Sequence, residues 1–337
     1  MTVGTVPPPA RTLTVDEAYA WCERLARTHY ENFPVGSRLL PRKTRRDLWA
    51  IYAFARTADD VADEPGRGTP EARLARLADW RARVEAAHRG DVATATAPRL
   101  APGGSHAGDE PVVATAGSRA DGDGAAGGSG GSAAAVPVFT ALAATIAARR
   151  LPLEPFTDLL SAFAQDVTTR RYGTWADLLD YCRRSADPVG RLVLMVHGYR
   201  DPGLFRLSDA VCTALQLTNH WQDLAIDLGE KDRLYIPQND LAAFGVREAD
   251  LARGILTDAY RRLMRELADR TRALFDAGRP LAARVGPELR LELRVVWHGG
   301  RTILERTAAV DFDVWRARPS LGARDFAAIL LKACLAR

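Results

Sequence analysis

The chain has 337 residues, enough to bury a sizeable core in one large domain or two small ones. Its composition is that of a globular protein, 47% hydrophobic and 26% charged, and a net charge of +4 is too small to argue for nucleic-acid binding. Four cysteines without CxxC spacing argue against a metal–thiolate site. No stretch approaches the ~18 apolar residues of a spanning helix, so we expect a cytoplasmic protein, with peripheral contact at the inner membrane surface left open.

Helical patterns begin after a loose, proline-rich lead at residues 1–12. Thr14 is placed as an N-cap, and Glu17 three residues later completes a capping box. Apolar residues then recur with helical spacing until proline and glycine cluster. We expect three helices in this part of the chain, at residues 13–30, 41–64 and 71–89.

Residues 92–135 consist mostly of glycine, alanine, serine, proline and aspartate, without an apolar face. Such a stretch buries too little surface to offset the entropy of ordering it. Three helices before it are too few for a core of their own. We therefore predict a disordered insertion in a surface loop of one domain at 13–337, rather than a boundary between two domains.

Beyond the insertion the helical pattern continues, and alternating β-branched runs bounded by hairpin turns are missing. The sequence therefore predicts an all-α protein with many helices around one core. The expected helices are 138–149, 155–170, 174–199, 204–229, 249–277, 287–309 and 322–335.

Two of these helices carry carboxylates where apolar residues are expected. Asp59 and Asp63 are four residues apart, and Asn219, Asp223 and Asp227 follow an i, i+4, i+8 order, so each set shares a helix face. Like charges at this spacing destabilise an isolated helix by about 0.2–0.5 kcal/mol per pair, and buried unpaired carboxylates cost far more. The alternative is that each pair is a solvated face beside arginines. Two such sets within apolar helices favour a site for Mg²⁺ and a diphosphate, because Mg²⁺ combines carboxylates, water and substrate phosphates.

The two segments "YAFARTADDVADE" and "QLTNHWQDLAIDLGEKDRLYIP" resemble the two Asp-rich motifs of the squalene/phytoene synthase family. The resemblance covers most of the chain outside the insertion and implies an α-helical isoprenoid-synthase fold with a central cavity. The segments "HYENFPVGSRLLP" and "YCRRSADPVGRLVL" are similar to those of HpnC-type hydroxysqualene synthases of bacterial hopanoid pathways. This implies Mg²⁺-dependent cleavage of presqualene diphosphate, with water capturing the cation to give hydroxysqualene.

Matched position by position, the resemblance implies roles for individual residues. The residues on the metal side are Asp59, Asp63, Asn219, Asp223 and Asp227. The residues near the diphosphate are Arg56, Arg233 and Tyr235, and Lys231 adds a point charge there. His29 and Phe33 cap the site, and Tyr181 faces the cavity. Two positions depart from the family pattern. His220 stands where an apolar or aromatic residue is usual, and Asp187 stands where asparagine is more common.

A carbocation needs apolar and aromatic surroundings, because the negative face of an aromatic ring attracts cations. Candidates are Phe33, Phe163, Tyr181 and Trp221, each with ordinary core packing as the alternative. Water capture needs a polar group, for which Asp166, Gln165 or Tyr181 is a candidate. Asp166 could instead be a surface aspartate paired with Arg170 at i+4.

Two other functions remain open from the sequence. The same aspartates suit a head-to-head synthase that makes presqualene diphosphate, squalene or phytoene from prenyl diphosphates. A non-catalytic isoprenoid-binding scaffold, which partners other enzymes of the squalene pathway, is the second alternative. Direct transfer of an isoprenoid substrate to or from other enzymes of the squalene pathway is compatible with each of these functions.

Overall fold

The computed structural model describes residues 13–28, 40–63, 68–98 and 130–335. These residues form fifteen α-helices and one 3₁₀ helix, and they contain no β-strand, which confirms the all-α prediction. The elements are α1 (Val15–Thr28), α2 (Arg42–Asp63), α3 (Pro70–His88), α4 (Val92–Thr96), α5 (Gly130–Arg149), α6 (Glu154–Thr168), α7 (Trp175–Ser185), α8 (Asp187–Val196), α9 (Pro202–Gln222), α10 (Leu224–Lys231), α11 (Gln238–Phe244), α12 (Glu248–Leu251), α13 (Asp258–Gly278), η2 (Arg279–Arg284), α14 (Pro287–Ala309) and α15 (Ala323–Leu335).

The capping box predicted for the first helix is present. The backbone N–H of Glu17 donates to Thr14 Oγ1 at 3.2 Å, and the backbone N–H of Thr14 donates to Glu17 Oε2 at 2.9 Å. These contacts satisfy two amide groups that a helix start otherwise leaves without a partner.

Three predicted helices are wrong as single units, because each is two helices. The range 174–199 divides into α7 and α8 at Ala186, since Pro188 has no N–H to donate to the preceding turn. The range 204–229 divides into α9 and α10 at Asp223, whose φ and ψ of −101° and 8° depart from helical values. The range 249–277 divides into α12 and α13, with Gly254 at φ +67° between them.

The predicted boundaries of the 92–135 insertion are also wrong, because both ends are helical. Asp91 caps α4 through a hydrogen bond from the Thr94 N–H at 3.0 Å, and α5 begins at Gly130 with alanine-rich sequence that favours helix. Residues 99–129 lie outside the described residues, so the disorder expected there stays a prediction. The same holds for the lead at 1–12.

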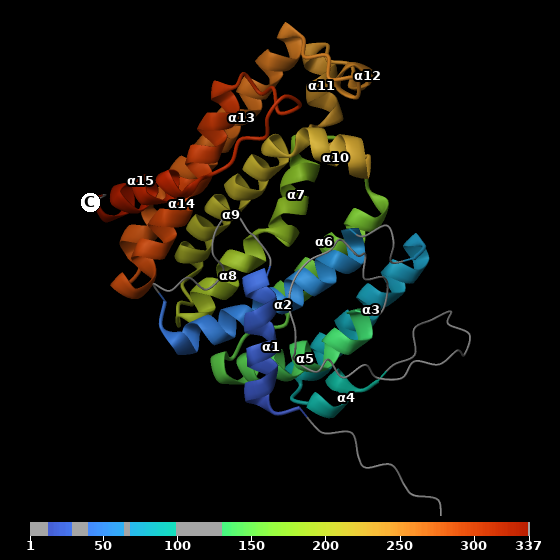
Figure 1. The fold of residues 1–337 in the computed structure, drawn as a ribbon, viewed down its shortest axis with the longest axis vertical. Helices are drawn as coiled ribbons and strands as arrows, with labels where there is room; N and C mark the ends of the chain where they lie inside the picture. Colours follow the sequence, from blue (N-terminus) through green and yellow to red (C-terminus); the bar gives the residue numbers. More distant parts are fainter. Residues whose placement is uncertain (1–12, 29–39, 64–67, 99–129, 336–337) are drawn as a thin grey trace, which may run out of the picture.

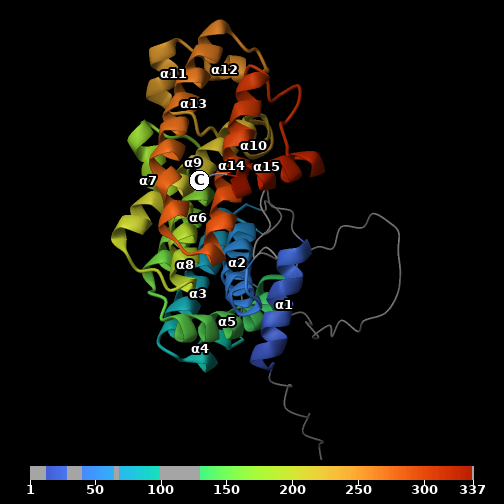
Figure 2. The same ribbon diagram turned by 90° about the vertical axis from the view of Figure 1, so that its left-hand side faces the viewer.

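The core consists of two packed clusters of apolar side chains. The first is built mainly from α1–α6 and α8, and the second from α7 and α9–α13. Leu215 and Trp297 pack against both clusters and so join them. In Figure 1 the early helices lie at the bottom, α7–α10 in the middle, and α11–α15 at the top and left; Figure 2 shows α15 at the outer edge beside α14. None of the described helices combines the length and apolar character needed to cross a bilayer.

Candidate active site

The two carboxylate motifs meet at the junction of the clusters, through the segment that follows α10. The guanidinium of Arg233 donates to Asp63 Oδ1 at 2.8 Å, and Lys231 Nζ donates to Asp63 Oδ2 at 2.9 Å. Lys231 Nζ also lies 3.7 Å from Asp227 Oδ1. One ammonium group thus lies between a carboxylate of the first motif and a carboxylate of the second, although Asp63 and Asp227 are 164 positions apart in the sequence.

Burial and charge shift the pKa values of these carboxylates in different directions. Desolvation and then the negative charge of Asp63 raise the pKa of Asp59. Desolvation acts on Asp63 too, but Arg233 and Lys231 outweigh it, so the pKa of Asp63 falls below its usual range. Burial raises the pKa of Asp227 to about 6, against the opposing effect of Lys231. Burial therefore outweighs the nearby cations at Asp59 and Asp227, but not at Asp63.

The second motif keeps its expected order across the break between α9 and α10. The Asp223 N–H donates to the Asn219 carbonyl at 2.8 Å, and the Asp227 N–H donates to the Asp223 carbonyl at 2.9 Å. The i, i+4, i+8 hydrogen-bonding rhythm of a helix therefore continues through Asp223, even though its backbone torsions are not helical.

The loop before α15 supplies a cation that the sequence analysis missed. Arg318 donates from Nε to Asp223 Oδ1 and from Nη2 to Asp223 Oδ2, the latter at 3.1 Å. Gln222 Nε2, next in sequence, donates to the Pro319 carbonyl at 2.5 Å. No sequence signal singles out Arg318, because the chain is rich in arginine and Arg318 is 95 residues from its partner.

An aromatic group lines the site beside Asp166. Tyr172, Tyr181 and Tyr235 are all buried, with ring centroids 5.4–5.9 Å apart. His220 stacks on Tyr235 with centroids 3.5 Å apart and planes inclined by 13°. Burial, followed by the charges of nearby basic residues, lowers the pKa of His220 to about 3, so its imidazole is neutral. The sequence did not single out Tyr172, which lies six residues after Asp166.

Asp166, on α6, is 4% exposed and faces these rings. Its Oδ2 accepts a hydrogen bond from the Tyr181 hydroxyl at 2.9 Å, while its Oδ1 has no hydrogen-bond partner among the described residues. Arg233 Nη2 donates to the backbone carbonyl of Asp166 at 2.8 Å. Burial raises the pKa of Asp166 to about 7, partly opposed by Arg233.

The alternative surface pairing of Asp166 with Arg170 is wrong. Asp166 is buried, and Arg170 Nη1 donates to the Lys231 carbonyl at 2.7 Å instead. An isolated β-bridge between Arg171 and Leu234 continues this contact, with the Leu234 N–H donating to the Arg170 carbonyl at 3.0 Å. These bonds hold the segment after α6 against the segment that carries Arg233 and Tyr235.

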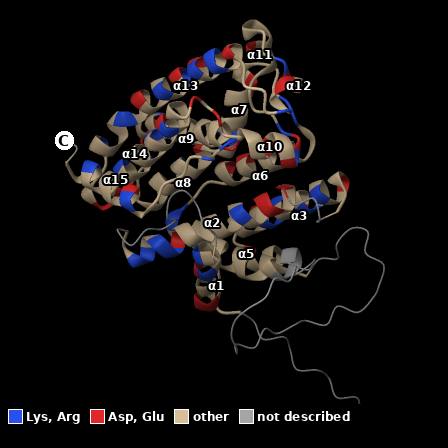
Figure 3. Cartoon of the chain, turned by 45° about the horizontal axis from the view of Figure 1, so that its top comes forward, with Lys and Arg blue, Asp and Glu red and all other residues tan. Residues whose placement is uncertain are grey.

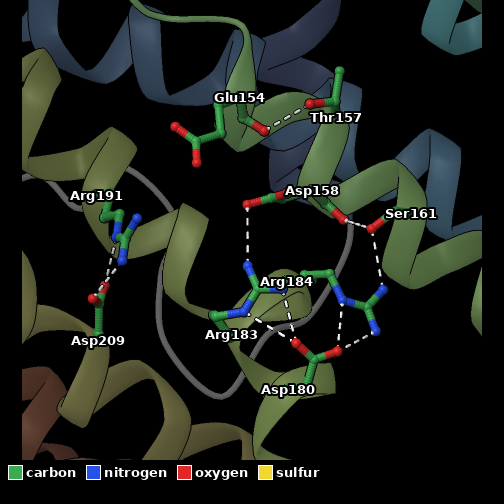
Figure 4. A network of polar contacts seen from close by, with 9 residues as sticks. All are labelled: Glu154, Thr157, Asp158, Ser161, Asp180, Arg183, Arg184, Arg191 and Asp209. Carbon is green, nitrogen blue, oxygen red and sulfur yellow. Dashed lines mark hydrogen bonds and ion pairs between the residues drawn. The ribbon is translucent and has the colours of Figure 1, made fainter.

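A polar network joins α6 and α7, and Figure 4 shows its contacts among Ser161, Asp180 and Arg184. Arg184 donates to Ser161 Oγ at 3.1 Å, to Asp180 Oδ2 at 2.9 Å and to Gln165 Oε1 at 2.5 Å. Gln165 Nε2 in turn donates to the Tyr172 hydroxyl at 3.4 Å. Gln165, a candidate for water capture, is thus occupied in holding Tyr172.

The remaining expected site residues have different positions. Arg56 lies on α2 with Nη2 2.8 Å from Asp60 and Nη1 3.7 Å from Asp59, beside the first motif. Trp221 points away from the motifs, because its Nε1 donates to Thr271 Oγ1 of α13 at 3.0 Å, which favours the core-packing alternative. Phe163 is buried in the first cluster, again as core packing would require. His29 and Phe33 lie outside the described residues.

The model of the squalene/phytoene synthase family matches residues 26–325. The chain belongs to this family. Hydroxysqualene synthase of Rhodopseudomonas palustris is 33% identical over 81% of this chain and 77% of its own length. Phytoene synthase of Thermus thermophilus is 32% identical over 93% of this chain and 91% of its own length. The crystal structure of squalene synthase HpnC from Alicyclobacillus acidocaldarius has a TM-score of 0.71 and 36% identity, covering 88% of this chain and 95% of that one. The resemblance and the helical isoprenoid-synthase fold are therefore confirmed, and the chain is an enzyme of the squalene/phytoene synthase family.

Proposed function

We propose that this family member converts presqualene diphosphate to hydroxysqualene in squalene or hopanoid biosynthesis. Similarity to hydroxysqualene synthases supports the reaction class. The choice of product rests on the contact between Tyr181 and Asp166. The Tyr181 hydroxyl donates to Asp166 Oδ2, while the buried Oδ1 has no protein donor among the described residues and lies beside the rings of Tyr172, Tyr181 and Tyr235, the aromatic wall of the site. A water molecule is the donor that this oxygen suits.

Mg²⁺ is the cofactor that the donor chemistry fits. The residues proposed to hold it offer oxygen ligands, and burial, followed by the negative charge of Asp63, raises the pKa of Asp59 to about 8. Within the described ranges no three acidic, histidine or cysteine side chains are grouped so that they could hold a metal ion by themselves, so water and substrate phosphates would have to complete the coordination. The proposed ligands are Asp59, Asp63, Asn219, Asp223 and Asp227. When bound, Mg²⁺ stabilises the negative charge that develops on the departing diphosphate.

The cations of the site bind and orient the diphosphate. Arg56 and Arg233 offer guanidinium forks that match phosphate oxygens, and Lys231 adds a point charge. Arg233 is held by Asp63 and by the Asp166 carbonyl, so its guanidinium is positioned before the substrate arrives. Tyr235 is the ring of the aromatic group that follows Arg233 most closely in sequence, and its ring lies 5.9 Å from that of Tyr181.

The aromatic wall protects the carbocation that remains. The ring faces of Tyr172, Tyr181 and Tyr235 attract a cation without donating electrons to a new bond. His220, the unusual residue of the second motif, is neutral and stacked on Tyr235, so it adds no repelling positive charge.

Water capture completes the reaction. The water oxygen forms a bond to the cationic carbon and loses one proton, and the products are hydroxysqualene and diphosphate. Asp166 Oδ1 accepts that proton, while the Tyr181 hydroxyl holds Oδ2 in place. A pKa of about 7 suits proton acceptance near neutral pH.

Product analysis by mass spectrometry tests the proposal. The purified full chain is incubated with presqualene diphosphate and Mg²⁺, with and without NADPH, and we expect hydroxysqualene in both cases. An Asp166→Asn variant should still release diphosphate but form hydroxysqualene about 10²-fold or more slowly than the wild type, the usual size of a general-base contribution. Unchanged turnover and product in that variant would remove Asp166 from water capture.

A head-to-head synthase is the second candidate, because the phytoene synthase of Thermus thermophilus matches more of the chain than the hydroxysqualene synthases do. Incubation with farnesyl diphosphate alone separates the two: its consumption by the purified protein contradicts hydroxysqualene formation as the reaction.

The scaffold alternative is tested in cells, where Asp59→Ala or Asp223→Ala should abolish hopanoid formation if the enzyme acts catalytically.

A further inference from the structure

Helix α10 ends in a turn whose central residue has a strained backbone. Asp232 has φ 51° and ψ 37°, in the left-handed region that residues with a side chain rarely adopt. Its backbone N–H and that of Arg233 both donate to the Asp227 carbonyl, the latter at 2.8 Å. The turn is therefore tied to the second carboxylate motif, and it decides where the residues on either side of it point.

Two cations of the active site flank this turn. Lys231 precedes Asp232 and Arg233 follows it, yet both side chains reach one carboxylate. Lys231 Nζ donates to Asp63 Oδ2 at 2.9 Å, and Arg233 Nη1 donates to Asp63 Oδ1 at 2.8 Å. Residues two positions apart do not face each other on a helix, so the left-handed turn is what brings the two cations together.

Two arginines from the segment after α6 hold the backbone of the turn. Arg170 Nη1 donates to the Lys231 carbonyl at 2.7 Å. Arg171 Nη1 donates to the Asp232 carbonyl, and Arg171 Nη2 donates to Asp232 Oδ1 at 2.7 Å. The carbonyls at the end of a helix have no N–H partner within it. The two guanidinium groups therefore supply donors to acceptors that α10 itself leaves open.

Arg171 is itself fixed by another element. Its Nε and Nη2 donate to Glu248 Oε1 of α12 at 2.8 and 2.5 Å, and Gln238 Nε2 donates to Glu248 Oε2 at 3.5 Å. In Figure 3 basic and acidic positions lie close together between α10 and α12. Anchoring of α12 alone would need only the contact with Glu248. The further bonds of Arg171 to Asp232 indicate that the turn is also held.

We propose that Arg170 and Arg171 are positioning residues for the diphosphate. They hold the turn at Asp232 in its left-handed form, so that the cations on either side of the turn stay directed at the phosphate oxygens. The inference rests on the proposed function, in which Lys231 and Arg233 bind the diphosphate. Neither positioning residue needs to touch the substrate.

The turn needs support of its own because Asp63 has two tasks. Asp63 is the partner of both cations, and it is also a proposed ligand of Mg²⁺. When its oxygen atoms bind the metal, the two cations lose this carboxylate and become available to phosphate oxygens. The bonds from Arg170 and Arg171 end on two carbonyls and on Asp232, none of which is a proposed metal ligand. These bonds can therefore keep the cations in place after Asp63 has changed partner.

Calorimetric binding of inorganic diphosphate to the full-length protein, in the presence of Mg²⁺, tests the inference. We expect Arg171→Gln to weaken this binding about tenfold, because a strained backbone persists only where its surroundings hold it. Arg247→Gln is the matched control. Arg247 Nε pairs with Asp250 of α12 at 2.8 Å, and no hydrogen bond between Arg247 and the turn occurs among the described residues. This variant should bind diphosphate like the wild type, and circular dichroism should show unchanged helix content in both variants.

A double-mutant cycle separates positioning from a general loss of structure. Lys231→Gln alone should weaken diphosphate binding, because it removes a proposed phosphate partner. In the Lys231→Gln background, Arg171→Gln should cost only about threefold or less, since one of the cations that it positions is absent. Two losses that simply multiply would mean that Arg171 acts independently of Lys231, and would overturn the inference.

The backbone of the turn provides a further test. Glycine adopts the left-handed conformation without strain, so adding Asp232→Gly to Arg171→Gln should restore about threefold or more of the lost affinity. Within this background the donor to Asp232 Oδ1 is already gone, so the comparison isolates the backbone.

The inference is overturned if Arg171→Gln binds diphosphate as tightly as the wild type, or if the added glycine restores nothing. Unchanged binding in Lys231→Gln would instead overturn the proposed diphosphate contact of Lys231, and the inference with it.

Discussion

The two carboxylate motifs hold their charges in different ways. The first lies on α2, an uninterrupted helix of 22 residues, and its Asp63 is paired with Arg233, whose side chain is 6% exposed. The second crosses a helix break, and its Asp223 is paired with Arg318, whose side chain is 38% exposed. The first pairing is thus buried and fixed, whereas the second is open to solvent and to exchange.

The origin of the cations also differs. Lys231 and Arg233 follow the second motif directly in sequence but neutralise the first, so the two motifs form one electrostatic unit. Arg318 comes from the loop before α15 and belongs to neither motif. The first motif is therefore neutralised by the segment that follows the second, while the second receives one of its cations from the loop before α15.

The largest expected effect comes from removing the buried cation of this unit. Arg233→Met leaves Asp63 with a weaker partner and removes the donor to the Asp166 carbonyl, so we expect the free energy of unfolding to fall by about 3–5 kcal/mol. Lys231→Met is the matched control, because it contacts the same carboxylate from a side chain that is 36% exposed. It should cost about 1 kcal/mol or less.

Urea unfolding of both variants at one pH measures the difference. Equal losses in the two variants would contradict the distinction between a buried and an exposed partner of Asp63. The same result would indicate that Asp63 is stabilised chiefly by the segment's backbone contacts, such as the Leu234 N–H to the Arg170 carbonyl.

The sequence predicted the parts of this site that depend on local spacing. The i, i+4 order of Asp59 and Asp63 survives because α2 is a regular helix, and the order of the second motif survives the break at Asp223 because the backbone bonds continue. The break itself was not predictable, since no proline or glycine marks it in "NHWQDLAID". By contrast, Pro188 does mark the break between α7 and α8, so the division of the predicted 174–199 helix is readable from the sequence.

Contacts between distant segments were beyond sequence reasoning. Tyr172 joins the aromatic wall only because a β-bridge brings its neighbours against the segment carrying Tyr235. Arg318 reaches Asp223 because the loop after α14 folds back over α9, and nothing local distinguishes it from other arginines. Pairings of this kind follow from tertiary packing and not from periodicity.

Asp187 is a buried aspartate whose hydrogen-bond partner is neutral, unlike the aspartates of the two motifs. It therefore shows the effect of burial on a carboxylate without the effect of an ion pair. Asp187 is 6% exposed and accepts a hydrogen bond from Thr213 Oγ1 at 2.8 Å, and burial raises its pKa to about 7. Since the folded-state pKa lies above the unfolded value of about 3.9, the folded protein loses stability as pH rises from about 4 to 7.

Asp187→Asn removes this titration and keeps the oxygen that Thr213 donates to. Its free energy of unfolding, relative to wild type, should therefore rise across that pH range, on the order of 3 kcal/mol in total. Asp180→Asn is the control. Hydrogen bonds from Arg183 and Arg184 lower the pKa of Asp180, so its contribution is constant above about pH 4. A difference between Asp187→Asn and wild type that does not change with pH would show that Asp187 is not protonated preferentially in the folded state.

The smallest effect on stability is expected at the exposed pair of Arg318 and Asp223 in the second motif. A change in Mg²⁺ binding is the more informative measurement there. Arg318→Ala should change the free energy of unfolding by less than about 1 kcal/mol, because its guanidinium is partly in solvent. Arg318 and Mg²⁺ compete for Asp223 if that carboxylate is a metal ligand, as proposed. The Arg318→Ala variant should then bind Mg²⁺ up to about fivefold more tightly than wild type in a calorimetric titration without substrate.

Arg306→Ala is the control. It removes a comparable ion pair with Asp325, from an arginine side chain that is 39% exposed, and it should leave the Mg²⁺ affinity unchanged. An unaltered Mg²⁺ affinity in both variants would place the ion away from Asp223, and would leave the first motif as the metal-binding half of the site.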